Sequence, residues 1–179
     1  MYMVLKPQDL YVALKIVASG SRGPYAKLAG ELGMSASEVH ASVKRAQSAR
    51  LIHGPELQNR PNLSALEEFL VHGLKYAFPA VRGEFTRGVP TSYAAEPLRH
   101  VIGHGKEPIP VWPYSRGLER GIALAPLYKT APDAALHDPV FYEYLALADG
   151  LRDGRARERK SAERELHRRF HEANARSEP

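Results

Sequence analysis

The sequence predicts a mainly α protein with a helical N-terminal third, an extended proline-rich middle segment and a long C-terminal helix. Both ends of the 179-residue chain carry apolar side chains at helical spacing. Nine of the 14 prolines and six of the 14 glycines fall between residues 79 and 139, where long helices are disfavoured because proline removes a backbone donor and clashes with the preceding turn. We therefore divide the chain into residues 1–61, 62–139 and 140–179.

Composition excludes several classes of protein. Apolar residues make up 44% of the chain, which is enough for a hydrophobic core, so the chain is not disordered as a whole. No run approaches the roughly 18 apolar residues of a membrane span, and the N-terminus lacks the basic start and apolar core of a secretory signal. The chain has no cysteine, which excludes disulfides and thiolate zinc sites and fits a cytoplasmic protein.

The first two predicted helices cover residues 6–18 and 25–32. Pro7 falls in the first turn of the first helix, where its missing N–H and fixed φ are tolerated. The second helix is followed by Gly33, a residue that adopts the left-handed backbone conformation of a helix end without steric strain. We therefore expect two short helices, the second of which ends in a sharp turn.

The third predicted helix covers residues 36–50. Ser35 and Glu38 form a capping box, in which the hydroxyl and the carboxylate satisfy the first free amides of the helix. Leu51 and Ile52 then form a short apolar strand. The residues after Ile52 show no clear second strand of alternating character.

One pattern spans the second and third helices in the segment PYAKLAGELGMSASEVHASVKRAQSARLI. The positions that carry it are Leu28, Ala29, Leu32, Gly33, Met34, Ser35, Val39 and Val43. Ala29 is small where two helices cross closely, and Gly33 turns the chain. This pattern resembles the winged helix-turn-helix of MarR-type transcriptional regulators, and longer stretches are similar to uncharacterised bacterial helix-turn-helix proteins of about this length. The alternative is a three-helix protein-interaction module with the same packing.

The resemblance implies that the third helix enters the major groove of double-stranded DNA. The DNA-binding residues that it implies are Arg22, Tyr25, Lys27, Ser35, Ser37, His40, Ala41, Lys44 and Arg45. Lys44 and Arg45 are expected to reach guanine or phosphate. For Ser35 we prefer the capping role, since the capping box already accounts for its hydroxyl.

The resemblance is incomplete at both ends of the segment. His53 and Arg60 lie either on a wing that touches the minor groove or on a short connecting turn. MarR proteins place a long dimerisation helix before this domain, whereas here the pattern begins almost at residue 1. We therefore expect dimer contacts from later residues, and the small-molecule pocket of that family is not carried over.

The charge distribution agrees with an anionic partner for the N-terminal third. The net charge of the chain is +5. Residues 1–60 hold eight basic and four acidic side chains, whereas residues 61–139 hold eight of each and residues 140–179 hold nine and eight. The surplus therefore coincides with the helix-turn-helix pattern, and the mixed-sign tail is typical of a solvated helical face with ion pairs four residues apart.

A helix is predicted over residues 65–78 in the middle segment. Ser64 and Glu67 form a second capping box, and Pro79 ends the helix. Large apolar side chains lie along one side of this helix, which favours packing in the core over contact with a partner protein. Beyond it, residues 101–102 and 109–112 are expected to be short strands or extended pieces.

The C-terminal helix is predicted to begin at Asp138 and Pro139, an N-cap residue followed by a proline at the first helical position. Two apolar stripes follow, one ending near Gly150 and one running from Ala162 to Ala173. Long amphipathic tails pair with a two-fold mate or pack on their own chain, so this helix is a candidate for dimerisation.

We find no pattern typical of an enzyme. His100 and His104 have the spacing of helical metal ligands, but Gly103 and Gly105 disfavour a helix there and no zincin glutamate accompanies them. We therefore expect no catalytic residue, no metal and no cofactor. The sequence predicts a repressor that binds a palindromic operator as a homodimer, and the alternative is an antitoxin-like module that binds a partner protein encoded nearby and regulates its own operon.

Overall fold

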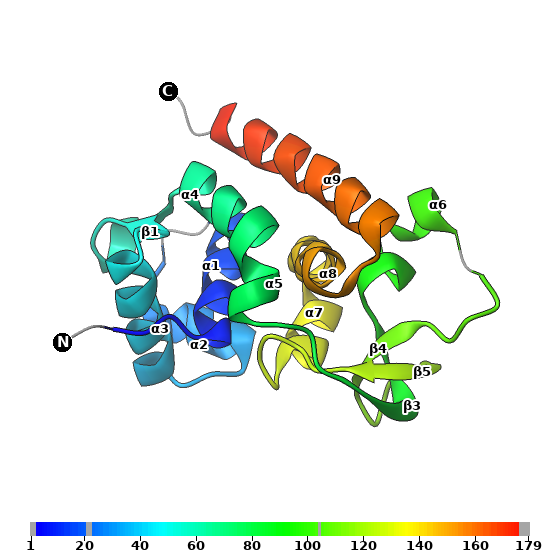
Figure 1. The fold of residues 1–179 in the computed structure, drawn as a ribbon. Helices are drawn as coiled ribbons and strands as arrows, with labels where there is room; N and C mark the ends of the chain where they lie inside the picture. Colours follow the sequence, from blue (N-terminus) through cyan, green and yellow to red (C-terminus); the bar gives the residue numbers. More distant parts are fainter. Residues whose placement is uncertain (1–2, 21–22, 104, 176–179) are drawn as a thin grey trace.

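A computed structural model describes residues 3–20, 23–103 and 105–175 of the chain. The described part is mainly helical, as the sequence predicts, with two small sheets. Figure 1 shows the first three helices on one side of the molecule, a three-stranded sheet on the other side, and the last two long helices between and across them.

The N-terminal helices lie close to their predicted positions. They are α1 (Pro7–Ser19), α2 (Tyr25–Leu32) and α3 (Ala36–Ser48). Gly33 separates α2 from α3 with a φ of 64°, the left-handed conformation that the sequence led us to expect. A Cβ atom there would lie 3.1 Å from Cγ2 of Thr130, so the turn is also tightly packed. The tight turn fixes how α3 is presented beside α2.

A two-stranded antiparallel hairpin follows α3, where the sequence indicated a single strand. Its elements are β1 (Ile52–His53), the 3-10 turn η1 (Glu56–Gln58) and β2 (Arg60–Pro61). The buried Asn59 holds it to the helices, because its amide nitrogen donates to the Tyr25 hydroxyl and to the Glu56 carbonyl, both at 3.0 Å. Gln47 on α3 donates to the Gly54 carbonyl at 2.7 Å. Side-chain hydrogen bonds therefore shape this hairpin, which explains why hydrophobic alternation did not reveal it.

One interrupted helical run replaces the helix predicted over residues 65–78. It comprises α4 (Leu63–Glu68), the π-helical turn η2 (Phe69–Gly73) and α5 (Leu74–Ala77). The N-cap is Asn62, whose side chain accepts the Ala65 amide at 3.2 Å, so the capping box predicted at Ser64 is wrong. Leu66, Leu70 and Leu74 are buried. The prediction of a core helix is thereby confirmed.

The proline-rich segment forms a small sheet rather than one extended stretch. Its elements are β3 (Arg82–Pro90), η3 (Ser92–Ala94), α6 (Arg99–Ile102), β4 (Pro110–Pro113), β5 (Glu119–Leu124) and α7 (Ala131–His137). β3 pairs antiparallel with β4 and with β5, and β4 pairs parallel with β5, which closes the sheet. Prolines end β3 and bound β4, positions where a missing N–H is tolerated. The strand expected at residues 101–102 is wrong, since these residues belong to α6.

The C-terminal region consists of two helices rather than one. α8 (Pro139–Asp153) begins at the predicted N-cap Asp138, which accepts the Phe141 amide at 3.0 Å, and α9 (Ala156–Ala175) follows after Gly154. The second apolar stripe is buried within the chain: the Phe170 ring lies 5.8 Å from the Tyr144 ring on α8. That stripe is therefore not a surface on which α9 can pair with a second copy.

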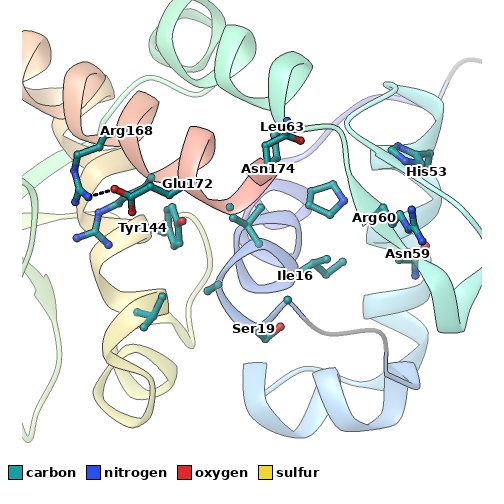
Figure 2. Close-up of a pocket in the computed structure, with 17 residues that line it drawn as sticks. Ile16, Ser19, His53, Asn59, Arg60, Leu63, Tyr144, Arg168, Glu172 and Asn174 are labelled. Atoms are coloured by element: carbon teal, nitrogen blue, oxygen red, sulfur yellow. Dashed lines mark hydrogen bonds and ion pairs between the residues drawn. The ribbon is translucent and has the colours of Figure 1, made fainter. Parts of the chain in front are cut away.

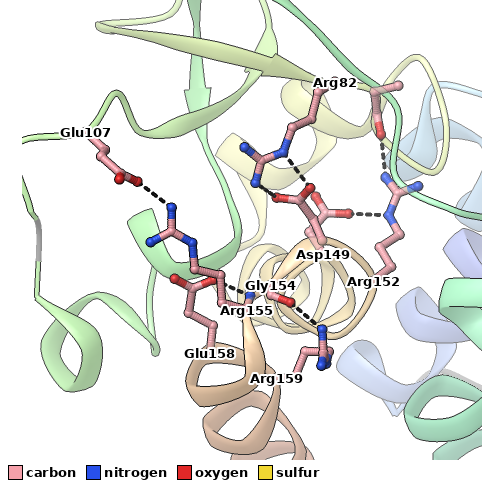
Figure 3. A network of polar contacts seen from close by, with 10 residues as sticks. Arg82, Glu107, Asp149, Arg152, Gly154, Arg155, Glu158 and Arg159 are labelled. Atoms are coloured by element: carbon pink, nitrogen blue, oxygen red, sulfur yellow. Dashed lines mark hydrogen bonds and ion pairs between the residues drawn. The ribbon is translucent and has the colours of Figure 1, made fainter.

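Charged residues fix the sheet to the junction of α8 and α9 (Figure 3). The buried Asp149 carboxylate accepts the Thr91 hydroxyl and the Trp112 indole N–H, both at 2.7 Å, and the Arg152 guanidinium at 2.8 Å. Arg82 at the start of β3 pairs with Asp153 at 2.8 Å. The sheet and the C-terminal helices consequently form one packed unit.

One hydrophobic cluster joins the three predicted segments. It contains Leu14 from α1, Leu70 from the interrupted helix, Trp112 from the sheet, and Phe141 and Phe170 from the C-terminal helices. Residues 1–61, 62–139 and 140–179 therefore share a core and are not separately packed.

An ion-pair triad around the buried Lys15 adds to this core. Nζ of Lys15, which is 4% exposed, lies 2.9 Å from Glu31 on α2 and 2.7 Å from Asp138 at the start of α8. Burial alone would lower the pKa of Lys15, but the hydrogen bonds and charges of Asp138 and Glu31 raise it. The triad links α1, α2 and α8.

Candidate nucleic-acid interface

The first turn of α3 is fixed by the capping box that the sequence predicted. The Ser35 amide donates to Oε2 of Glu38 at 2.8 Å, and the Glu38 amide donates to Oγ of Ser35 at 3.2 Å. The backbone and side-chain hydrogen bonds from Ser35, together with the Tyr128 hydroxyl, lower the pKa of Glu38. Ser35 is exposed, but its hydroxyl belongs to the cap.

The face of α3 that points away from the core is exposed. Val39, Val43 and Ala46 are buried on the inner side. The outer side carries the exposed Ser37, His40, Lys44 and Ser48 and the half-buried Ala41. A rotation of 100° per residue places these five on one stripe. We call this stripe the outer face of α3, and it contains four of the predicted DNA-binding residues.

Arg45 does not belong to the outer face, contrary to the prediction. Its guanidinium donates to both carboxylate oxygens of Asp9 on α1, at 2.7 to 3.1 Å, and to Oγ of Ser42 at 3.2 Å. The Asp9 side chain is 0% exposed and the Arg45 side chain 14%. Arg45 therefore compensates a buried carboxylate and braces α3 against α1.

Tyr25, predicted as a DNA contact, has a structural position instead. It is buried, its hydroxyl accepts the Asn59 amide, and its backbone N–H donates to Glu56 at 3.2 Å. Its ring lies 5.6 Å from the His40 ring, so the start of α2 lies next to one edge of the outer face. Tyr25 thus joins α2, α3 and the hairpin.

The remaining predicted contacts lie around this edge. Lys27 is exposed on α2, while Arg22 lies outside the described residues. His53 and Arg60 are exposed and opposite each other on the hairpin. The sequence left open whether these two residues lie on a wing or on a turn, and the structure places them on paired strands.

A segment from the middle of the chain borders the opposite edge of the outer face. The Tyr128 hydroxyl donates to Oε1 of Glu38 at 2.9 Å, and the Thr130 hydroxyl donates to the Leu32 carbonyl at 2.6 Å. Lys129 between them is exposed. No local pattern indicated this contact, because it joins residues about ninety positions apart.

In the head, residues 3–20 and 23–60, two carboxylates pair with cations, two accept only neutral donors, and five cations have no ion-pair partner among the described residues. Its carboxylates are all engaged: Asp9 with Arg45, Glu31 with Lys15, Glu38 with Ser35 and Tyr128, and Glu56 with the Tyr25 amide. The basic side chains of this part without an ion-pair partner in the described structure are Lys6, Lys27, Lys44, Arg50 and Arg60. The head therefore presents uncompensated positive charge, which attracts polyanions.

An open groove borders the hairpin side of this interface and shares His53 and Arg60 with it (Figure 2). It has a volume of about 890 Å³ and lies between α1, the hairpin, α8 and α9. Arg168 and Glu172 on one wall pair with each other at 2.5 Å, whereas Arg60 on the opposite wall has no ion-pair partner among the described residues. No outer-face residue lines the groove.

The described residues hold no cluster of three or more histidines and carboxylates that is suited to a metal ion. His100 pairs with Glu96 at 2.8 Å. His104, considered with it as a metal ligand, lies outside the described residues. Within the same part of the chain, no helix combines the length and apolar character needed to span a membrane.

Comparisons of the chain with protein-family models, with curated proteins and with solved structures gave no match. The function is therefore inferred from the residues and geometry of the chain itself.

Proposed function

We propose that this protein is a double-stranded DNA-binding transcriptional regulator of the winged helix-turn-helix type, a cytoplasmic bacterial repressor that binds a palindromic operator as a homodimer. The observation that carries the proposal is the outer face of α3. It is an exposed polar stripe on a helix that is braced on its inner side and flanked by cations without ion-pair partners among the described residues. A major groove about 12 Å wide admits a helix of this kind.

The residues of the outer face have chemistries suited to base edges. Lys44 is a donor for guanine O6 and N7, and the Ser37 hydroxyl both donates and accepts. The half-buried methyl group of Ala41 suits the thymine methyl group. His40 adds ring nitrogens that act as donor or acceptor according to tautomer.

Phosphate contacts would come from the cations around the outer face. Lys27 lies on α2 together with Tyr25, and Arg60 lies on the hairpin that Asn59 joins to Tyr25, next to the His40 edge. Such contacts set orientation and affinity without reading sequence. In this arrangement the hairpin acts as the wing.

A dimer follows from the amount of sequence that one α3 can read. A single recognition helix contacts few base pairs, and a two-fold pair reads two half-sites about 34 Å apart. The stripe of α9 is already buried in its own chain, so the dimer surface must lie elsewhere.

The test begins with selection of binding sites from randomised duplex DNA by the full chain. Gel shifts on the selected site then compare wild type with Lys44→Ala and with Lys160→Ala, an exposed lysine on α9 that serves as matched control. We expect Lys44→Ala to lose about 1–3 kcal/mol and to relax the preference at one base pair. Failure to select any site, or equal behaviour of the two variants, would refute the role of α3.

A second candidate function, binding of a partner protein in the manner of an antitoxin, is favoured by the outer side of β3 and β5. Phe85 is 52% exposed and Leu118 is 93% exposed. Arg87 and Arg120 lie directly opposite each other, and the Arg120 guanidinium lies 5.4 Å from the Phe85 ring. Opposed like charges are unfavourable in a sheet, so a partner with carboxylates would stabilise this surface.

This candidate is tested by co-expression with the product of the neighbouring gene. Phe85→Glu should abolish co-purification while leaving DNA affinity unchanged. Leu136→Asp, which alters an exposed leucine on α7, is the matched control. Retention of the partner by Phe85→Glu would exclude this surface.

A further inference from the structure

The edge of α3 opposite Tyr25 is formed by two distant parts of the chain. Glu38 and Arg45 are seven residues apart and lie on the same side of the helix, since seven residues make almost two full turns. Tyr128 from the middle segment binds Glu38, and Asp9 from the first turn of α1 binds Arg45. The start of α1 and the segment 127–130 therefore line this edge together.

Each of these two segments carries an exposed lysine. Lys6 is the N-cap residue of α1, and its backbone N–H donates to the same Asp9 carboxylate at 2.8 Å. Lys129 follows Tyr128, and its ammonium lies 5.9 Å from the centroid of that ring. Both lysines therefore lie next to α3. Lys6 is near the Asp9–Arg45 pair, and Lys129 is near the Tyr128–Glu38 hydrogen bond; we call Arg45 and Glu38 the two docking points on α3.

Neither lysine forms an ion pair with a carboxylate of the described residues. The acids on this edge are Asp9, which pairs with Arg45, and Glu38, which accepts hydrogen bonds from Ser35 and Tyr128. The charge of Lys129 contributes to the lowered pKa of Glu38. Lys6 and Lys129 have no ion-pair partner among the residues that the structure describes. Two ammonium groups thus remain available to an anion along the edge.

The spacing of the two docking points on α3 suits a nucleic-acid strand. These points, seven residues apart, are separated by about 10 Å along the helix at a rise of 1.5 Å per residue. Successive phosphates of one DNA strand advance by about 3.4 Å along the duplex axis, so a surface of this length can reach more than one phosphate of the strand.

We propose that Lys6 and Lys129 contact phosphates of the DNA strand that borders α3 on the side opposite the hairpin. The DNA-binding surface then extends beyond residues 25–61 to the start of α1 and to the middle of the chain. α3 lies between two phosphate-binding edges, one with Lys27 and Arg60 and the other with Lys6 and Lys129. This inference rests on the proposed function and adds a second strand contact to it.

The experiment measures the salt dependence of binding to a short duplex of mixed sequence. Lys6→Ala, Lys129→Ala and the double variant are compared, as full-length chains, with wild type, Lys44→Ala and the control Lys160→Ala. Loss of one phosphate contact makes the slope of log K against log salt less steep by about 0.9. Between 50 and 200 mM salt, the ratio of wild-type to variant affinity should therefore shrink about 3.5-fold for each single variant and about 12-fold for the double variant.

The outcomes separate the two proposals. Slopes that fall by about one unit for each edge lysine, with Lys160→Ala unchanged, support the inference. If the wild-type chain binds DNA while the slopes of Lys6→Ala and Lys129→Ala match that of the control, the edge assignment is wrong and the proposed function stands. If the wild-type chain does not bind DNA, both fall. Circular dichroism spectra of the variants verify that each is folded.

Discussion

Arg45 offers the sharpest distinction between a structural and a DNA-binding role on α3. The perturbation is Arg45→Ala, compared with Lys44→Ala one position earlier. Arg45 reaches both oxygens of the Asp9 carboxylate, which is 0% exposed, whereas Lys44 is exposed and has no ion-pair partner among the described residues. The two variants should therefore fail in different assays.

The expected magnitude depends on the contacts that Arg45→Ala leaves to Asp9. The Asp9 carboxylate would keep only the Lys6 amide as a hydrogen-bond donor among the described residues. Removing one partner of a buried ion pair destabilises by about 3–5 kcal/mol. Because the Arg45 side chain is 14% exposed, water can partly replace it, and we expect the lower end, about 3 kcal/mol. Lys44→Ala should stay within about 0.5 kcal/mol of wild type.

Calorimetry or thermal melting followed by circular dichroism measures this difference. For a chain of this size, about 3 kcal/mol lowers Tm by about 6–12 °C. The double variant Asp9→Asn, Arg45→Ala removes both charges and should recover at least about 1 kcal/mol relative to Arg45→Ala. Well below its Tm, the double variant should also keep the wild-type salt dependence of DNA binding.

The refuting result is an Arg45→Ala variant that melts within about 2 °C of wild type while its salt slope becomes less steep by about 0.9. Arg45 would then contact phosphate in solution, as the sequence predicts, and the pair with Asp9 would contribute nothing measurable. Destabilisation by Lys44→Ala would equally contradict the division of the two roles.

Three further predictions concern the connections between the head and the rest of the chain. Asp138 has a lowered pKa, because hydrogen bonds from Lys15 and the Phe141 amide outweigh the burial that would raise it. Its stabilisation is therefore present above about pH 4 and is lost as pH falls further. Asp138→Asn should flatten acid unfolding, followed by fluorescence, below about pH 4. Gly33→Ala places a methyl group on a backbone with a φ of 64° and against Thr130. The free energy of unfolding, measured with urea, should fall by about 1–2 kcal/mol, and unchanged stability would exclude this turn geometry. Asp149→Ala removes the carboxylate that accepts hydrogen bonds from Trp112 and Thr91, and we expect a destabilisation of about 3 kcal/mol. The near-UV circular dichroism spectrum of the single tryptophan should change, and an unaltered spectrum would contradict the observed contact.

Local patterns predicted the N-terminal helices because their signals are short-range. The capping box of Ser35 and Glu38, the left-handed Gly33 and the N-cap Asp138 each depend on residues within four positions of one another. The same reasoning failed at Ser64, because Asn62 two residues earlier offered a competing cap. Short-range signals thus place helices reliably but choose less well between neighbouring caps.

The sheet and the interface edges depend on long-range contacts that local patterns do not encode. β3 is largely exposed, so it shows no alternation of buried and exposed residues, and its partners lie about thirty positions away. Arg45 and Tyr25 carry the residue types expected of DNA contacts, but their buried partners Asp9 and Asn59 come from other elements. Residue type alone therefore identified the exposed face of α3 but wrongly assigned Arg45 and Tyr25 to DNA contact.

The shared core has a consequence for how the proposed function must be studied. A fragment ending near residue 80 would retain the helix-turn-helix pattern but would expose Leu14 where it meets the cluster containing Phe141. It would also leave Lys15, 4% exposed in the full chain, without Asp138, and would remove the Tyr128 contact to α3. A loss of DNA binding in such a fragment would then reflect a disturbed head rather than a missing dimer surface. Point variants in the full chain separate these effects, because they change one contact while the common core stays intact.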